Sequence, residues 1–299
     1  MDNNRIQTIA DVFILTGLVI LGMISFSVLG ILICMPIFNI EFGQIKNILE
    51  QTDIANKSLL FKIFNLSATF GAWVVSSLIY LKMRGYKIQS ALLLQLPEKP
   101  ISLLFLPLLF LALIISSSFL LQLAQQINWP DFLMKFNSEQ NKAMLETMLK
   151  MDNLSDFGLN LLFIALAPAM FEEIFFRGVL QRMFIFLFKN HHYGIFFTSF
   201  LFAAIHLNVE QFIPMLALSS VFGYVCYYSN SLLPGVILHF LNNAFAVFIY
   251  YFSEKNPIAR QLADDQFSPP IFISIFSVFL VVGLVYYFYK LNQIKATHE

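Results

Sequence analysis

Residues 163–180 read FIALAPAMFEEIFFRGVL, an apolar stretch that contains two adjacent glutamates and one arginine. An ionised side chain at the centre of a bilayer costs about 2.5–3.5 kcal/mol on insertion scales, whereas each Leu, Ile or Phe returns only about 0.3–0.6 kcal/mol. Three charges facing lipid would nearly cancel the hydrophobic gain of this segment. We therefore expect Glu172, Glu173 and Arg177 to face the protein interior or a wet cavity, either in a functional site or as a buried ion pair that only joins helices.

The composition of the whole chain indicates a membrane protein. Of its 299 residues, 58% are hydrophobic and 12% are charged, and the mean hydropathy is +0.73. Soluble domains contain about 45–50% apolar and 25% charged residues, and the continuous apolar runs disfavour a β-barrel. With 18 basic and 18 acidic residues, the chain offers no basic surface for nucleic acid. We predict an all-α, polytopic membrane protein.

Windows of about 20 apolar residues predict eight transmembrane helices, near residues 12–38, 60–81, 101–123, 157–187, 194–208, 211–229, 233–252 and 270–290. The fifth window is short and requires tilting or shielding by its neighbours. The first has no basic cluster before it and no small-residue cleavage site after it, so we expect a retained span rather than a signal peptide. Residues 124–156 are expected to form an amphipathic segment on the membrane surface.

The simplest division of the chain is one integral domain with three parts. Residues 1–150 hold the first three spans and the amphipathic segment, residues 151–255 form a core with the ionisable side chains, and residues 256–299 hold the last span and a tail. Basic residues are densest in the short loop 82–99. The positive-inside rule places this loop, and with it both termini, in the cytoplasm.

Helical spacing sorts the polar side chains of the core into groups. Residues four apart share a helix face, so Glu173 is expected to pair with Arg177, and His239 to project together with Asn243. Glu172 is rotated by about 100° from Glu173 and stays outside the ion pair. One carboxylate is then neutralised by its arginine, while the other is left for a different task.

A further histidine, His206, follows an apolar window and completes a set that could hydrolyse an amide. A glutamate and a histidine can share general-base work on a water molecule, and a histidine with an asparagine can donate hydrogen bonds to a developing oxyanion. Cys34 and Cys226 lie far apart in apolar runs, so we expect neither a disulfide framework nor a cysteine-based metal site.

Three motifs, in this order on successive predicted spans, resemble those of the CAAX prenyl protease and bacteriocin-processing (Abi) family of membrane proteases: Glu172-Glu173-xxx-Arg177, Phe202-xxx-His206 and His239-xxx-Asn243. The likeness covers about residues 157–250 and includes SLLPG at 231–235. It implies an intramembrane endopeptidase whose eight helices enclose a hydrophilic catalytic cavity, with residues 151–255 as the catalytic core.

The same resemblance assigns roles to the motif residues. Glu172 and His206 would activate the attacking water. His239 and Asn243 would form the oxyanion hole, while Glu173 and Arg177 would hold the fourth span in place. The resemblance also implies a bacterial inner membrane, a peptide or membrane-protein substrate, and no cofactor or metal.

Two other functions fit these residues. His206, His239 and one glutamate could bind catalytic zinc, which often uses two His and one Glu; however, no HExxH helix is present, and Asn243 would then have no role. A transporter, or a non-catalytic scaffold for immunity or secretion, is a different class. The absence of a visible inverted repeat disfavours a secondary transporter, whereas the scaffold remains an open alternative.

Overall fold

The structure is a computed structural model that describes residues 3–42, 56–135, 139–253, 256–263 and 267–293. Its regular elements follow the chain in this order: α1 (Asn3–Phe38), α2 (Lys57–Thr69), η2 (Phe70–Val75), α3 (Ser76–Met83), α4 (Ile88–Ala91), η3 (Pro100–Phe105), α5 (Leu106–Gln125), α6 (Asp131–Met134), α7 (Glu139–Leu149), α8 (Leu154–Asn160), η4 (Leu161–Leu166), α9 (Ala167–Glu173), η5 (Ile174–Leu180), α10 (Gln181–Phe188), α11 (His191–Ile205), α12 (Phe212–Ser229), α13 (Leu233–Ser253), α14 (Pro257–Ala263) and α15 (Ile271–Gln293). The segments η2, η4 and η5 are π-helical, and η3 is a 3₁₀-helix.

Within the described residues, 7 helical segments are long and apolar enough to cross a membrane: Ile6–Phe38, Lys57–Met83, Pro100–Gln125, Leu154–Phe188, Phe212–Ser229, Leu233–Ser253 and Ile271–Asn292. The predicted fifth span is α11, an apolar helix of 15 residues. At 1.5 Å per residue it is about 22 Å long, shorter than a hydrocarbon core of about 30 Å. The prediction of an all-α, polytopic membrane protein is confirmed.

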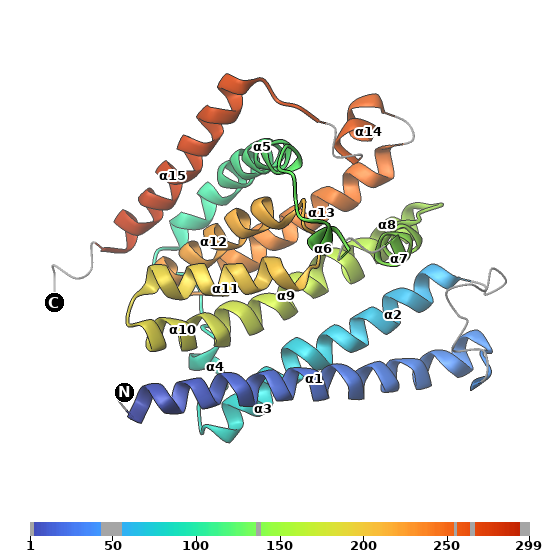
Figure 1. Cartoon of the computed structure of the whole chain (residues 1–299), viewed down its shortest axis with the longest axis horizontal. Coiled ribbons are helices and arrows are strands. Elements are labelled where there is room, and N and C mark those ends of the chain that lie inside the picture. Colours follow the sequence, from blue (N-terminus) through green and yellow to red (C-terminus); the bar gives the residue numbers. More distant parts are fainter. Residues whose placement is uncertain (1–2, 43–55, 136–138, 254–255, 264–266, 294–299) are drawn as a thin grey trace.

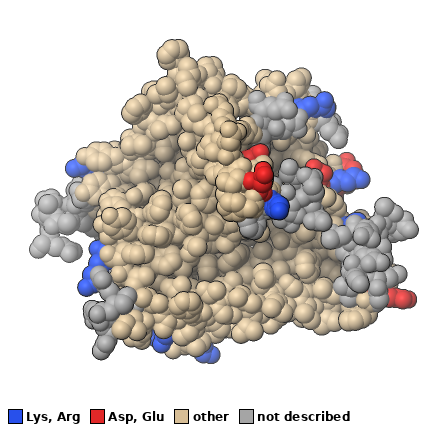
Figure 2. Space-filling view, in the orientation of Figure 1, with Lys and Arg blue, Asp and Glu red and all other residues tan. Residues whose placement is uncertain are grey.

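The long helices run roughly from one end of the molecule to the other (Figure 1). The helices α1, α2 and α3 form a layer along one side, while α5 and α15 lie on the opposite side of α12. The first turn of α1 and the last turn of α15 lie at the same end of the molecule. On the face shown in Figure 2, most charged side chains lie toward the left and right sides, one group of acidic and basic side chains lies right of the centre, and the rest of the face is largely uncharged, as expected for helices that cross a bilayer.

The helix α12 lies between two buried apolar clusters. One cluster joins Cys226 to side chains of α1, α3, η5, α10 and α11. The other joins Phe222 and Val225 to side chains of α5, α13 and α15. Because both clusters share α12, this helix connects the core to the outer helices on either side and fixes the position of the polar groups between them.

The first two spans approach each other at two glycines. A Cβ atom at Gly22 of α1 would collide with the backbone carbonyl of Gly71 in η2, and a Cβ at Gly71 would collide with the Gly22 carbonyl. Small residues at such crossings let membrane helices pack backbone to backbone. Here the contact holds α1 against the second span.

The predicted amphipathic segment forms the short helices α6 and α7. The side chain of Met148 in α7 is buried with Leu60 and Phe61 of α2, and Ser58 Oγ donates a hydrogen bond to the Met148 carbonyl at 3.2 Å. Leu145, one turn before Met148 in the same helix, is exposed. One face of α7 therefore packs on the second span. Phe136, which the spacing places on the apolar face, lies outside the described residues.

Candidate functional site

The fourth span changes its helical type twice around the glutamates. The π-helical segment η4 ends just before Pro168, and the Ala167 N–H bonds to the carbonyl of Leu162, five residues back. Pro168 follows within the continuous helical span Leu154–Phe188, where it has no N–H to donate to the preceding turn. Glu172 and Glu173 end α9, and a second π-helical segment, η5, begins directly after them. Single π-helical turns inside α-helices occur frequently at functional sites.

The ion pair that the four-residue spacing predicts is present and fully enclosed. Arg177 Nη1 lies 2.8 Å from Glu173 Oε1, and the two side chains are 1% and 0% exposed. Arg177 Nη2 also donates to the carbonyl oxygen of Ser219 at 2.9 Å and to its Oγ at 2.7 Å. The guanidinium carbon lies 5.1 Å from the ring centroid of Phe202 and 5.7 Å from that of Phe222. Arg177 thus joins the fourth span to both α11 and α12.

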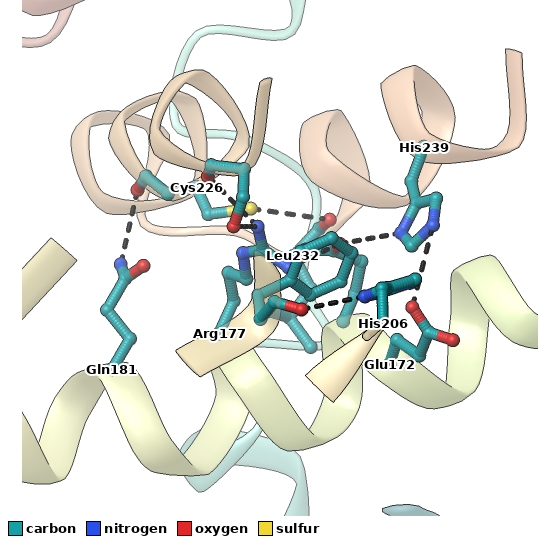
Figure 3. A network of polar contacts seen from close by, with 11 residues as sticks. Glu172, Arg177, Gln181, His206, Cys226, Leu232 and His239 are labelled. Atoms are coloured by element: carbon teal, nitrogen blue, oxygen red, sulfur yellow. Dashed lines mark hydrogen bonds and ion pairs between the residues drawn. The ribbon is translucent and has the colours of Figure 1, made fainter. Parts of the chain in front are cut away.

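His239, in the second turn of α13, contacts both carboxylates, and Figure 3 shows its ring facing Glu172. Its Nδ1 is 2.9 Å from Glu173 Oε1, and its Nε2 is 3.7 Å from Glu172 Oε2. Glu173 Oε1 therefore accepts hydrogen bonds from both Arg177 and His239. A carboxylate beside Nδ1 fixes the orientation of the imidazole and directs Nε2 toward Glu172.

The two adjacent glutamates differ in environment. Glu173 is fully buried and its Oε1 is shared by two donors. The Glu172 side chain is 14% exposed. Its Oε2 is buried without a hydrogen-bond partner among the described residues. Glu173 Oε2 is likewise buried without a partner among these residues, so the two carboxylates differ in the two hydrogen bonds that Glu173 Oε1 accepts and Glu172 lacks.

His206 follows the last residue of α11 and is connected to the site through Phe202. The His206 Nδ1 lies 2.7 Å from the Phe202 carbonyl oxygen, so Nδ1 donates and Nε2 of the neutral ring carries the lone pair. The Phe202 ring lies 4.7 Å from the His206 ring and 5.8 Å from the His239 ring, between centroids. The rings of Phe202 and His206, which are four residues apart, are in tilted contact at an interplanar angle of 46°. Among the described residues no hydrogen bond joins His206 to Glu172.

Asn243 lies one turn after His239 on the regular helix α13, so the two share a face. The amide nitrogen of the neighbouring Asn242 lies 3.4 Å from Asn243 Oδ1. With Oδ1 engaged in this way, the amide N–H groups of Asn243 are left as donors.

A close approach of α13 to the ion pair requires a residue without a side chain. A Cβ atom at Gly235 would lie 2.9 Å from Glu173 Oε2 and would collide with the Sγ of Cys226. Cys226 is itself buried, with its Sγ 3.8 Å from the Leu232 carbonyl oxygen. Gly235 therefore allows α13 to come close enough for His239 to reach the glutamates.

Sequence reasoning missed two parts of the site. It treated Glu173 as the partner of Arg177 alone, whereas Glu173 also holds His239. It did not identify Ser219, which supplies two acceptors to Arg177. The only signal was a hydroxyl-bearing residue in an otherwise apolar run, and such residues commonly bond to their own helix backbone. Helical spacing relates residues on one helix, and both of these contacts join different helices.

These observations define a class of molecule: a polytopic membrane protein whose fourth span carries a buried Glu–Arg pair bonded to a histidine of another span. Residues 155–245 match the family model described as type II CAAX prenyl endopeptidase Rce1-like, and this part of the chain belongs to that family. The matched segment contains all the motif residues, so the predicted resemblance is confirmed. No curated protein and no solved structure matches the chain.

The described residues also bear on the zinc alternative. Among them, no group of three or more His, Cys, Asp or Glu side chains is arranged to hold a metal ion. The ring of Phe202 contacts both His206 and His239. The ligand set of the zinc alternative is thus not assembled in this arrangement, and chelation provides a functional test.

Proposed function

We propose that the chain is an intramembrane, metal-independent endopeptidase that cleaves a peptide or membrane-protein substrate. The observation that carries this proposal is the contrast between the two glutamates. Glu173 Oε1 accepts hydrogen bonds from Arg177 and His239, whereas Glu172 accepts none among the described residues and lies 3.7 Å from His239 Nε2. Glu172 is outside the ion pair and lies next to the His239 imidazole. In a segment that matches a family of endopeptidases, such a carboxylate is suited to general-base catalysis.

In the proposed mechanism, Glu172 and His206 activate a water molecule. As the water oxygen bonds to the scissile carbonyl carbon, its proton passes to the Glu172 carboxylate. The lone pair on His206 Nε2 accepts a hydrogen bond from the same water. Breakdown of the tetrahedral intermediate then breaks the C–N bond, and the leaving amine takes the proton from Glu172.

The proposed oxyanion hole consists of His239 and Asn243. Because His239 Nδ1 donates to Glu173, donation from Nε2 to an oxyanion requires a ring that carries both protons. The Asn243 amide supplies the second donor from the same helix face.

Asn243→Ala is expected to lower the rate constant for cleavage by about 100- to 1000-fold, with little change in apparent affinity, because an oxyanion donor acts only as charge develops. Measured kcat and KM values distinguish these effects. Asn242→Ala removes only a side chain that contacts Asn243 Oδ1 and should have a much smaller effect. Equal losses at both positions, or a pure affinity defect at Asn243, would contradict the oxyanion assignment.

Incubation with a chelator is expected to leave the cleavage rate unchanged, since no step of the proposed mechanism uses a metal. Elemental analysis of the purified protein should find less than one zinc per chain. Loss of activity on chelation, followed by recovery on adding zinc back, would favour the zinc protease instead.

The function itself is tested with the purified protein and a library of membrane-anchored candidate peptides. Products are mapped by mass spectrometry for the parent and for Glu172→Ala. Discrete cleavage by the parent alone supports the endopeptidase, whereas no cleavage by either favours the scaffold alternative. We place the protein in a bacterial inner membrane with both termini in the cytoplasm. The motif resemblance and the basic loop 82–99 support this location, as does the position of α1 and α15 at one end of the molecule.

A further inference from the structure

A cavity of about 500 Å³ lies away from the glutamates, where several spans end. Its walls come from the start of α1, the end of α3, the connection into α4, and the segments η5 and α10. This volume is within the range of about 300–1,000 Å³ that is typical of small-molecule sites. Because it lies at the ends of membrane-spanning segments, the cavity is at the level of the bilayer surface.

The polar side of the cavity carries more positive than negative charge. Three basic residues and one acidic residue line it: Arg84, Lys87, Arg182 and Asp11. Asp11 forms an ion pair with Arg84 and accepts a hydrogen bond from the Tyr80 hydroxyl at 3.0 Å. Arg182 donates to the carbonyl oxygen of Ala91. These bonds join α1 to the end of α3, and α10 to α4, so both parts of the polar wall are held in place.

The other side of the cavity is apolar. Leu81, Val179, Met183 and Phe186 line it. Phe186 is 55% exposed, and Tyr86, which also lines the cavity, is 57% exposed. In a membrane-spanning protein such exposed aromatic side chains at span ends face the lipid interface. The cavity therefore combines cationic hydrogen-bond donors with an apolar wall that lies next to the lipid.

We infer that this cavity binds the phosphate-bearing headgroup of an anionic phospholipid. Guanidinium and ammonium groups bind phosphate oxygens through charge-assisted hydrogen bonds, and basic pockets between spans hold anionic headgroups. The apolar wall and the position at the bilayer surface favour a lipid over a soluble phosphate ester, because the acyl chains continue from the cavity into the membrane. The bound headgroup bridges the connection between α3 and α4, which carries Lys87, and α10, which carries Arg182, and it does so whether or not the chain is a protease.

The test measures lipid binding to the delipidated, detergent-solubilised protein by native mass spectrometry. Phosphatidylglycerol, phosphatidylcholine and sn-glycerol 3-phosphate are titrated separately. The parent is expected to bind phosphatidylglycerol at least about tenfold more tightly than either of the others. Each removed cation is expected to weaken phosphatidylglycerol binding by about fivefold, so Lys87→Gln combined with Arg182→Gln should weaken it by about 25-fold.

Two further variants distinguish this site from general surface charge and from misfolding. Lys189→Gln removes an exposed cation just after α10 and outside the cavity, and it should change the affinity by less than about twofold. Lys87→Gln alone alters an exposed side chain and should keep the fold with about a fivefold loss. Equal binding of phosphatidylcholine, equal tight binding of glycerol phosphate, or an equal loss in Lys189→Gln would overturn the lipid assignment. The assignment would also be overturned if Lys87→Gln combined with Arg182→Gln left the affinity for phosphatidylglycerol unchanged and weakened the binding of substrate peptide.

Discussion

Glu172→Gln is expected to lower the rate constant for peptide cleavage by about 10⁴-fold, the upper end of the range for a general base. Glutamine keeps the shape of the side chain but accepts no proton from the attacking water. The thermal unfolding midpoint in detergent should stay near that of the parent. Glu172 lies outside the Arg177 ion pair, and its Oε2 is 3.7 Å from His239 Nε2. Cleavage rates and unfolding midpoints are measured on the same preparations.

The matched control for this variant is Glu146→Gln, which removes one exposed carboxylate from α7. It should retain the parental rate and stability, because surface substitutions usually change stability by less than about 0.5 kcal/mol. If Glu172→Gln unfolds as readily as a variant of the buried pair, then Glu172 is structural. If it cleaves at the parental rate, the general base must be another residue.

Arg177→Ala is expected to destabilise the protein by about 3–5 kcal/mol, because removing one partner of a buried ion pair leaves the other charge uncompensated. Without Arg177, the Glu173 carboxylate would remain buried without its guanidinium partner. The carbonyl and hydroxyl of Ser219 would lose their donor. The substitution would also remove the side chain that joins α9–η5 to α12. Equilibrium unfolding in mixed micelles, or the shift in thermal midpoint, measures this loss.

Two variants separate the ion pair from a general effect of removing an arginine. Arg260→Ala removes an exposed arginine of α14 and should change stability by less than about 0.5 kcal/mol. Arg177→Lys keeps the charge but cannot reproduce the planar set of donors, so it should recover only part of the stability. If Arg177→Lys restored the full stability, the charge alone would explain the effect. If Arg177→Ala were as stable as the parent, the ion pair would not stabilise the fold.

The membrane-spanning helices were predictable because the physics of the bilayer leaves few solutions. A span must be apolar, long and helical, so the windows near residues 101–123 and 233–252 correspond to Pro100–Gln125 and Leu233–Ser253. The short fifth window was also predictable, and it became α11. The π-helical segments η4 and η5 were not, since the chain carries no local signal that separates an i→i+5 turn from an α-helical one.

Within the site, contacts along one helix could be predicted and contacts between helices could not. The spacing of Glu173 and Arg177 was sufficient to predict their pair. The bond from His239 to Glu173 and the acceptors of Ser219 depend on how α12 and α13 pack against α9. That packing in turn requires the bare backbone of Gly235. The cavity at the start of α1 combines residues from five elements, so no local pattern marks it.

The central claim is that two adjacent carboxylates on one helix turn have different tasks. The most direct test compares Glu172→Gln with Glu173→Gln, measuring cleavage rate and unfolding midpoint for both. The account predicts that Glu172→Gln loses its activity and keeps its stability. It predicts that Glu173→Gln loses stability, because Arg177 and His239 lose their shared charged acceptor. Equal stability losses in the two variants, or full activity in Glu172→Gln, would contradict it.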